Sequence, residues 1–401
     1  MRTLIRNVRV FDGERTVTGA DVLIDGDRIA EPDAAAPAAV EVDGTGRTLL
    51  PGLIDAHAHA FDGDLAEALT FGVTTELDMN NLPPTLAVQR RLAAERDDVA
   101  DLRSSGMVAT APGGHPTQIM TADVLRAFGS DTGLDTVADA DQAKAFVAAR
   151  LAEGADYLKI AVDDGAVSGM RLPVIGPELA AVLVEAGHAA GLRVIAHTVT
   201  AREALIALDA GVDGLAHLYT DVDEQGAEDM AARVASYDVF VASTITYIEA
   251  VSGDPAGAEL LRDPRVAARL SERARSTFDR EFTGIPMHAR GVVNASHAAS
   301  ALLRAGVPLL AGTDATPFGP VHGAGLHHEL LRLTEAGLTP EQALSSATSV
   351  TARCFGLADR GRIAPGLRAD LLLVDGDPTS DITATRAIAD VWRAGVRQER
   401  R

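Results

Sequence analysis

Lysine is almost absent from this chain of 401 residues, because only Lys144 and Lys159 contribute to its 36 Lys and Arg residues. Arginine therefore carries nearly all of the positive charge. The single cysteine, Cys354, excludes an internal disulfide and fits a reducing compartment. No apolar run approaches the roughly 18 residues that span a bilayer, and the N-terminus lacks a signal-peptide core followed by a cleavage site. We therefore expect a cytoplasmic protein without a membrane partner.

Acidic residues outnumber basic ones, and the formal net charge is -21. Such a negative field argues against nucleic acid and anionic membranes as partners. It does not identify a substrate, because the local charge at a pocket mouth can oppose the global sign. We expect a small-molecule substrate, and the sequence leaves the oligomeric state open, a homo-oligomer included.

The two ends of the chain carry strand patterns, whereas the centre alternates strands with amphipathic helices. Alternation with period two and Asp-Gly turns dominate residues 1–51 and 352–401, which predicts that both ends pair into one small β-sandwich domain. The α/β alternation of residues 52–351 predicts a (β/α)8 TIM barrel. The expected barrel strands are 53–59, 73–79, 104–110, 157–162, 193–198, 214–218, 240–245 and 308–315.

Two connections of the predicted barrel are longer than a simple turn. One follows the third strand and contains APGGHPTQIM, and the other runs from about Tyr247 to Arg290 after the seventh strand. Long loops at the C-terminal face of a barrel usually shape the substrate pocket. Helix starts are expected at Thr200 and at Thr339, where Pro340 follows at the first helical position.

Six candidate metal ligands lie at or near the C-terminal ends of predicted strands. The C-terminal ends of barrel strands converge on one face, where the active site lies. Imidazole and carboxylate groups together suit zinc and similar divalent ions. His57 and His59 of LIDAHAH would share one face of their strand, because strand side chains alternate. The six residues are His57, His59, Lys159, His197, His217 and Asp314.

Lys159 is the unusual member of this set, since an ammonium group repels a cation. It fits only as a carbamate, formed from the amine and CO2, which is an anion with two oxygens that can bridge two metal ions. Arginine, which this chain uses almost everywhere else, cannot take that role because only a primary amine forms the adduct. The alternative is an ordinary lysine at a strand end.

With these motifs the chain resembles members of the amidohydrolase superfamily, and the resemblance covers essentially its whole length. PGLIDAHAH, GADYLKI, two later histidines and GTDA stand in the family's order, and TSVTARCFGLADRGRIAPGLRADLLLVDGDP is a typical ending. The most similar subgroup is that of the imidazolonepropionase-like hydrolases, which include Xaa-Pro dipeptidases. The resemblance implies two divalent metal ions, most simply Zn²⁺, and a bridging hydroxide.

The resemblance also implies a role for each ligand. His57, His59 and Asp314 would bind the first ion, and His197 and His217 the second. Carbamylated Lys159 would bridge both ions. Asp314 would also take the proton of the attacking water and pass it to the leaving group.

Four further residues are candidates for substrate contact, and two of them, His115 and Tyr219, also for catalysis. His115 belongs to a Gly-Gly-His loop that resembles the subgroup's, and Tyr219 stands where a smaller residue is common in the family. Arg171 could bind a carboxylate bidentately, and His322 follows the eighth strand. For His115, Arg171 and His322 a purely structural or solvated role is the competing interpretation.

We therefore predict a metal-dependent hydrolase that cleaves an amide bond of a small carboxylate-bearing molecule. A second hypothesis keeps the fold and metals but forms a heterocycle by dehydrative cyclisation, which the unusual sequence around Tyr219 keeps open. A third, a non-catalytic scaffold, fits poorly because such proteins lose ligands and all six are present here.

Overall fold

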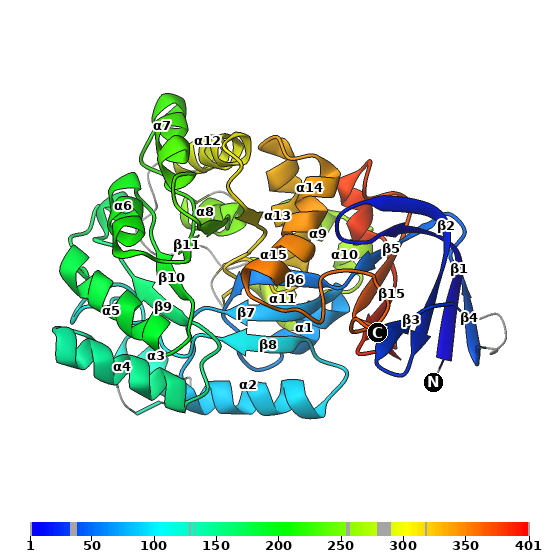
Figure 1. The fold of residues 1–401 in the computed structure, drawn as a ribbon, viewed down its shortest axis with the longest axis horizontal. Helices are drawn as coiled ribbons and strands as arrows, with labels where there is room; N and C mark the ends of the chain where they lie inside the picture. Colours follow the sequence, from blue (N-terminus) through cyan, green and yellow to red (C-terminus); the bar gives the residue numbers. More distant parts are fainter. Residues whose placement is uncertain are drawn as a thin grey trace.

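The computed structural model describes residues 2–32, 38–127, 130–131, 133–253, 257–278, 290–316 and 319–399. Strands from the two chain ends lie side by side at one edge of the molecule, and the central part of the chain forms the rest (Figure 1). In the described part of the chain, no helix is long and apolar enough to cross a membrane.

Both chain ends build one β domain, as predicted. Its strands form a single connected sheet in the order β16-β15-β14-β5-β1-β2-β3, with β4 paired to β1, rather than two separately bonded layers of a sandwich. A buried cluster that includes Ile5, Leu49, Leu373 and Trp392 holds it together. The strands are β1 (Arg2–Phe11), β2 (Thr16–Asp25), β3 (Arg28–Ala30), β4 (Val40–Asp43), β5 (Arg47–Pro51), β14 (Leu371–Asp375), β15 (Ile388–Arg393) and β16 (Val396–Arg397).

Eight parallel strands form the central barrel. Two sheets, β6-β7-β8 and β9 to β13, are joined by the isolated bridges Ala109 to Ile160 and Ala58 to Ala315, which close the ring. The strands are β6 (Leu53–Ala58), β7 (Val73–Asp78), β8 (Asp101–Ser104), β9 (Leu158–Ala161), β10 (Val194–His197), β11 (Gly214–Ala216), β12 (Phe240–Ala242) and β13 (Leu309–Leu310).

Helices surround the barrel. The expected starts at Thr200 and Thr339 are confirmed, because each side chain accepts a bond from the third backbone N–H of its helix in a capping box. The helices are α1 (Asp64–Thr70), α2 (Pro83–Glu95), α3 (Ala122–Ala127), α4 (Ala140–Ala152), α5 (Pro177–Ala189), α6 (Ala201–Ala210), α7 (Glu224–Val234), α8 (Ile245–Val251), α9 (Ala258–Arg262), α10 (Pro264–Ala267), α11 (Glu272–Phe278), α12 (Gly291–Arg304), α13 (Ala324–Glu335), α14 (Pro340–Ser346) and α15 (Ser349–Cys354), with short 3-10 turns at Ala166–Ser168 and Ile382–Arg386.

The third barrel strand differs from the prediction. It was expected at residues 104–110, but β8 spans Asp101–Ser104, and only Ala109 of the expected range bridges to β9. Asp101, the first residue of this strand, pairs with Arg360 and Arg368, and local periodicity does not reveal this long-range partnership.

The long connection after β12 contains α8 to α11, and its residues 279–289 lie outside the described part. The predicted domain boundary at residue 352 falls inside α15, where Ala352 packs with barrel residues such as Ile54 and Leu310.

Candidate metal centre

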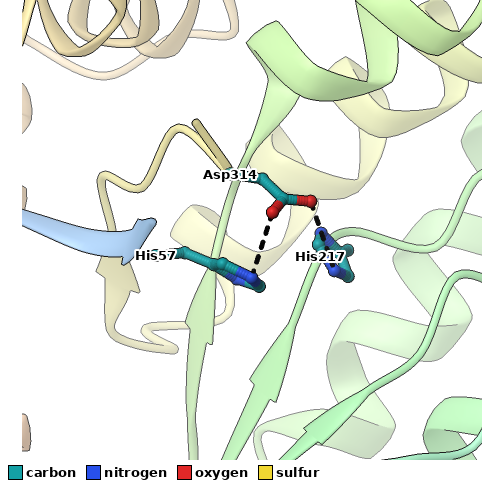
Figure 2. Close-up of side chains that lie close together, drawn as sticks. All are labelled: His57, His217 and Asp314. Atoms are coloured by element: carbon teal, nitrogen blue, oxygen red, sulfur yellow. Dashed lines mark ion pairs between the residues drawn. The ribbon is translucent and has the colours of Figure 1, made fainter. Parts of the chain in front are cut away.

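Asp314 stands at the centre of a buried histidine cluster at the C-terminal ends of the strands. Its Oδ1 lies 3.0 Å from His59 Nε2 and 3.3 Å from His57 Nε2, and its Oδ2 lies 3.9 Å from His217 Nε2. Figure 2 shows His57 and His217 on either side of the Asp314 carboxylate. The ligand atoms of His57, His217 and Asp314 lie within 4.8 Å of one another, close enough to meet at one divalent ion, and His59 contacts the same carboxylate.

His217 reaches this space through a break in strand alternation. Ala216 packs in the interior cluster of the barrel, so regular alternation would direct His217 toward the helices. The φ of 78° at His217 reverses that direction. Asp314 (φ 54°) and Thr244 (φ 51°) share this costly left-handed conformation. Non-glycine residues in strained backbone conformations cluster at functional sites, which is what the barrel shows here.

Neighbouring groups fix the histidine rings. His59 Nδ1 lies 3.0 Å from the carbonyl oxygen of Asn80 and must donate to it, which leaves Nε2 as the nitrogen with the lone pair. His217 Nδ1 lies 2.7 Å from Thr244 Oγ1, so its Nε2 is the nitrogen that faces Asp314. Outer partners of this kind orient the imidazole ligands of metal ions.

Asp55 ties the first strand to the loop that carries Asp314. Its Oδ1 accepts hydrogen bonds from the N–H groups of His57 and Thr313, and its Oδ2 accepts one from Thr313 Oγ1 at 2.7 Å. Burial, together with the charge of Glu76, raises the pKa of Asp55 to about 7. The relative positions of His57 and Asp314 thus depend on one buried carboxyl group.

The protonation states of the His57 and His217 imidazoles suit the binding of a cation. Burial lowers the pKa of His57 and His217 well below the ordinary value, and the charge of Lys159 adds to this, so both imidazoles are neutral at pH 7. Burial also lowers the pKa of Lys159 to about 7, against the opposing charges of Asp314 and Asp78. Metal ligands must be free of protons, and His57 and His217 meet that condition. Lys159 is partly protonated near pH 7, and the hydrogen bond to Asp314 raises the pKa of His59 against the effect of burial.

Two buried polar atoms without hydrogen-bond partners also indicate that these residues fit a metal ion. Lys159 Nζ and His217 Nε2 are buried and have no hydrogen-bond partner among the described residues. Unpaired buried polar atoms are costly and rare in native structures. A metal ion at His217 and an adduct at Lys159 would satisfy both.

A second group of possible ligands lies beside the first. Asp163 Oδ2 is 3.3 Å from His197 Nε2 and 3.4 Å from His115 Nδ1. The rings of His197 and His217 are 4.5 Å apart, so the two groups adjoin. Sequence analysis missed Asp163, although its place directly after the fourth strand was a usable signal.

The sequence model of the Amidohydrolase family matches residues 48–397. The chain belongs to this family. With the His/Asp clusters described above, it is a metal-dependent amidohydrolase, an enzyme that acts on carbon–nitrogen bonds.

Similar proteins agree with this assignment. Imidazolonepropionase from Deinococcus deserti is 42% identical over 101 residues, an alignment that spans 24% of this chain and 25% of that protein. Imidazolonepropionase from Cereibacter sphaeroides is 27% identical over 98% of this chain and 96% of its own length. A crystal structure of a Xaa-Pro dipeptidase with bound methionine covers 100% of both chains with a TM-score of 0.76 and 22% identity, and shows the shared fold.

The predicted substrate contacts of this amidohydrolase lie in different surroundings. Tyr219 is buried in the layer between barrel and helices, and its hydroxyl donates to the carbonyl oxygen of Ala227 in α7. His322 is 5% exposed and contacts the carboxylates of Glu76 and Asp64. His115 adjoins the second ligand group, and Arg171 is exposed in the loop after β9.

Burial sets the protonation of these groups. It raises the pKa of Tyr219 above its ordinary range and lowers that of His115 to about 3, where the charge of His197 acts in the same direction. The structure thus joins His115 to the candidate metal centre, whereas it gives Tyr219 and His322 protein partners of their own. Tyr219 was singled out because it stands where a smaller residue is common in the family, and such a departure does not say which way the ring points.

Proposed function

We propose that this amidohydrolase hydrolyses an amide bond of a small carboxylate-bearing molecule with two divalent metal ions, most simply Zn²⁺, and a carbamate on Lys159. The observation that carries the proposal is the buried cluster of His57, His217 and Asp314 next to the unpaired amine of Lys159. The full-length likeness to a Xaa-Pro dipeptidase supports a dipeptide-like substrate.

His57, His59 and Asp314 would hold the first ion, and His197 with His217 would contribute to the second. Two such ions, when bound, lower the pKa of a shared water and polarise the substrate carbonyl. Asp314 is the group that moves the proton: its carboxylate lies between the ligand histidines, where it can accept the proton of the water and donate it to the departing nitrogen.

Lys159 is suited to capture CO2 because its amine is buried, unpaired and has a pKa lowered to about 7 by that burial. A neutral amine is required for the adduct, and near pH 7 a large fraction is neutral. The other lysine, Lys144, is exposed on α4 and serves as a matched control.

Arg171 is the candidate group for the substrate carboxylate. It is exposed in the loop between β9 and α5, at the C-terminal side of the barrel. A free carboxylate would be repelled by the net charge of -21, so a local cation is physically required. The single Cys354 supports a cytoplasmic location.

The test is a kinetic comparison of N-acyl amino acids and dipeptides with their carboxamide analogues, on the metal-loaded parent and Arg171→Ala. We expect the free acid to be hydrolysed better by the parent, and Arg171→Ala to lower kcat/KM for the acid alone by about tenfold or more, since a hydrogen bond to a charged group is lost. Arg202→Ala, on an exposed arginine already paired with Asp164, is the control.

Product analysis in the same assay separates hydrolysis from dehydrative cyclisation. Release of amine and acid supports the proposal. A heterocycle formed with loss of water from an ortho-hydroxyanilide, without amide cleavage, would overturn it.

A further inference from the structure

Asp163 is a buried carboxylate that aims one oxygen at two imidazole rings. It follows β9, and its Oδ1 is fixed by the N–H of Gly165 at 2.8 Å. Its Oδ2 is left facing His197 Nε2 at 3.3 Å and His115 Nδ1 at 3.4 Å. The three ligand atoms of this group lie within 4.8 Å of one another, close enough to meet at one ion.

The Nδ1 edge of the His115 ring faces this carboxylate. Besides Asp163 Oδ2, the side-chain amide nitrogen of Gln118 lies 3.0 Å from His115 Nδ1. The Nε2 edge of the His197 ring faces the same oxygen. Two imidazole nitrogens and one carboxylate oxygen, which are ligand types that suit divalent ions, therefore face one another.

The backbone holds His115 against Asp163. Gly114 permits the close approach of the two loops, because a Cβ there would lie 2.6 Å from the carbonyl oxygen of Pro173 and 2.8 Å from Thr110 Oγ1. The rings of His115 and His197 stack with centroids 4.4 Å apart and planes at 18°. The two stacked rings therefore face the same carboxylate oxygen of Asp163.

The neighbouring carboxylates are already engaged. Asp164 accepts from the N–H of Ala166 and pairs with Arg202. Glu203 accepts from the N–H groups of Asp164, Val199 and Thr200. Among these three acidic side chains, Asp163 is the one with an oxygen directed at imidazoles, and Asp164 is its matched control.

We propose that Asp163 and His115 are protein ligands of the second metal ion together with His197. With His217, which the proposed function also assigns to this ion, they would supply three imidazoles and one carboxylate, ligand types that suit zinc. The inference rests on the two-metal function proposed above and deepens it: the second ion has an anionic protein ligand of its own, so its binding does not require the carbamate of Lys159.

The experiment measures metal binding and not turnover. Chelator-treated protein is titrated with Co²⁺, the bound ions per chain are counted by mass spectrometry, and the visible absorption of each bound Co²⁺ is followed. The variants are Asp163→Asn, which keeps an acceptor for the N–H of Gly165, His115→Ala, Lys159→Met and the control Asp164→Asn. Circular dichroism and thermal melts confirm that each variant folds.

We expect the parent, Asp164→Asn and Lys159→Met to bind two Co²⁺ ions. Asp163→Asn and His115→Ala should bind the second ion at least about 100-fold more weakly, because losing a ligand exceeds the 10–100-fold effect of an outer partner. The inference is overturned if both variants bind the second ion within threefold of the parent, or if Lys159→Met alone loses it. Failure of the two-metal function would look different, since the parent itself would then bind fewer than two ions.

Discussion

At the scale of single residues, the centre depends on backbone conformations that side-chain patterns do not reveal. Three of the five described non-glycine residues with positive φ, namely His217, Thr244 and Asp314, belong to the site or its immediate support. The sequence predicted the identities of the ligand candidates, because HxH and GTDA are local motifs. It could not predict that His217 turns against the alternation of its strand, or that Asp163 faces His115 and His197.

Asp314→Asn tests the proton transfer at this scale. The amide keeps the shape and one oxygen of Asp314 but removes the basic group, so turnover should fall by about 10²–10⁴. Substrate binding should change much less. Steady-state kinetics of metal-loaded parent and variant decide this, and an unchanged kcat would exclude Asp314 as the proton carrier.

Lys159 gives a prediction for CO2 and pH. Its pKa of about 7 means that the ammonium form dominates below this value and the neutral amine above it, so carbamate formation rises as the pH increases through 7. Lys159→Ala should lose most activity and regain part of it with short carboxylic acids, whereas Lys144→Arg should match the parent. Full activity in Lys159→Arg would refute the carbamate, because guanidinium does not form one.

Thr244→Val removes the oxygen that orients the His217 ring while keeping a side chain of similar size. Since Thr244 Oγ1 lies 2.7 Å from His217 Nδ1, we expect metal affinity to fall by about 10–100-fold, as for other partners of ligand histidines. A Co²⁺ titration measures this. Equal affinity in parent and variant would show that the ring is held by packing alone.

At the scale of elements, alternation and capping patterns located most of the barrel strands and the helix starts at Thr200 and Thr339, but they missed long-range charge pairs. Asp101, at the start of β8, pairs with Arg360 and Arg368, which lie far along the chain. His322, a candidate for substrate contact, lies just before α13, where it contacts Glu76 of β7 and Asp64 of α1. Neither partnership has a local sequence signal.

His322 should therefore act on stability rather than on substrate recognition. Burial alone would lower its pKa, but the charges of Asp64 and Glu76 raise it to about 9. A raised pKa means that the contribution to stability is complete below about 6.5, the unfolded value, and is lost as the pH rises through 9. His322→Gln should destabilise the protein by about 3–5 kcal/mol at pH 6, because the buried Glu76 loses its charged partner and Asp64 keeps only Arg273 among the described residues.

Urea unfolding of parent and His322→Gln at several values between pH 6 and 9.5 checks this prediction. The difference in the free energy of unfolding should shrink as the pH rises. A difference that is constant with pH would mean that His322 is neutral and acts through packing.

At the scale of the whole molecule, the chain ends and the centre separated as predicted into one β domain and one closed barrel. The order of strand and helix patterns sufficed for this, because strand-rich ends and an alternating centre permit few arrangements. The sequence left the connection of the eight outer strands undefined, since their single sheet is set by pairings such as β5 with β14 that join opposite ends of the chain.

The central claim is that the buried centre binds two divalent metal ions and uses them to hydrolyse an amide. The most direct measurement is a titration of chelator-treated protein with Zn²⁺ in the presence of bicarbonate, in which bound ions per chain and release of amine from an N-acyl amino acid are recorded together. The account predicts negligible activity without metal and a rise that saturates at two ions per chain. Full hydrolytic activity in protein without bound metal would contradict it.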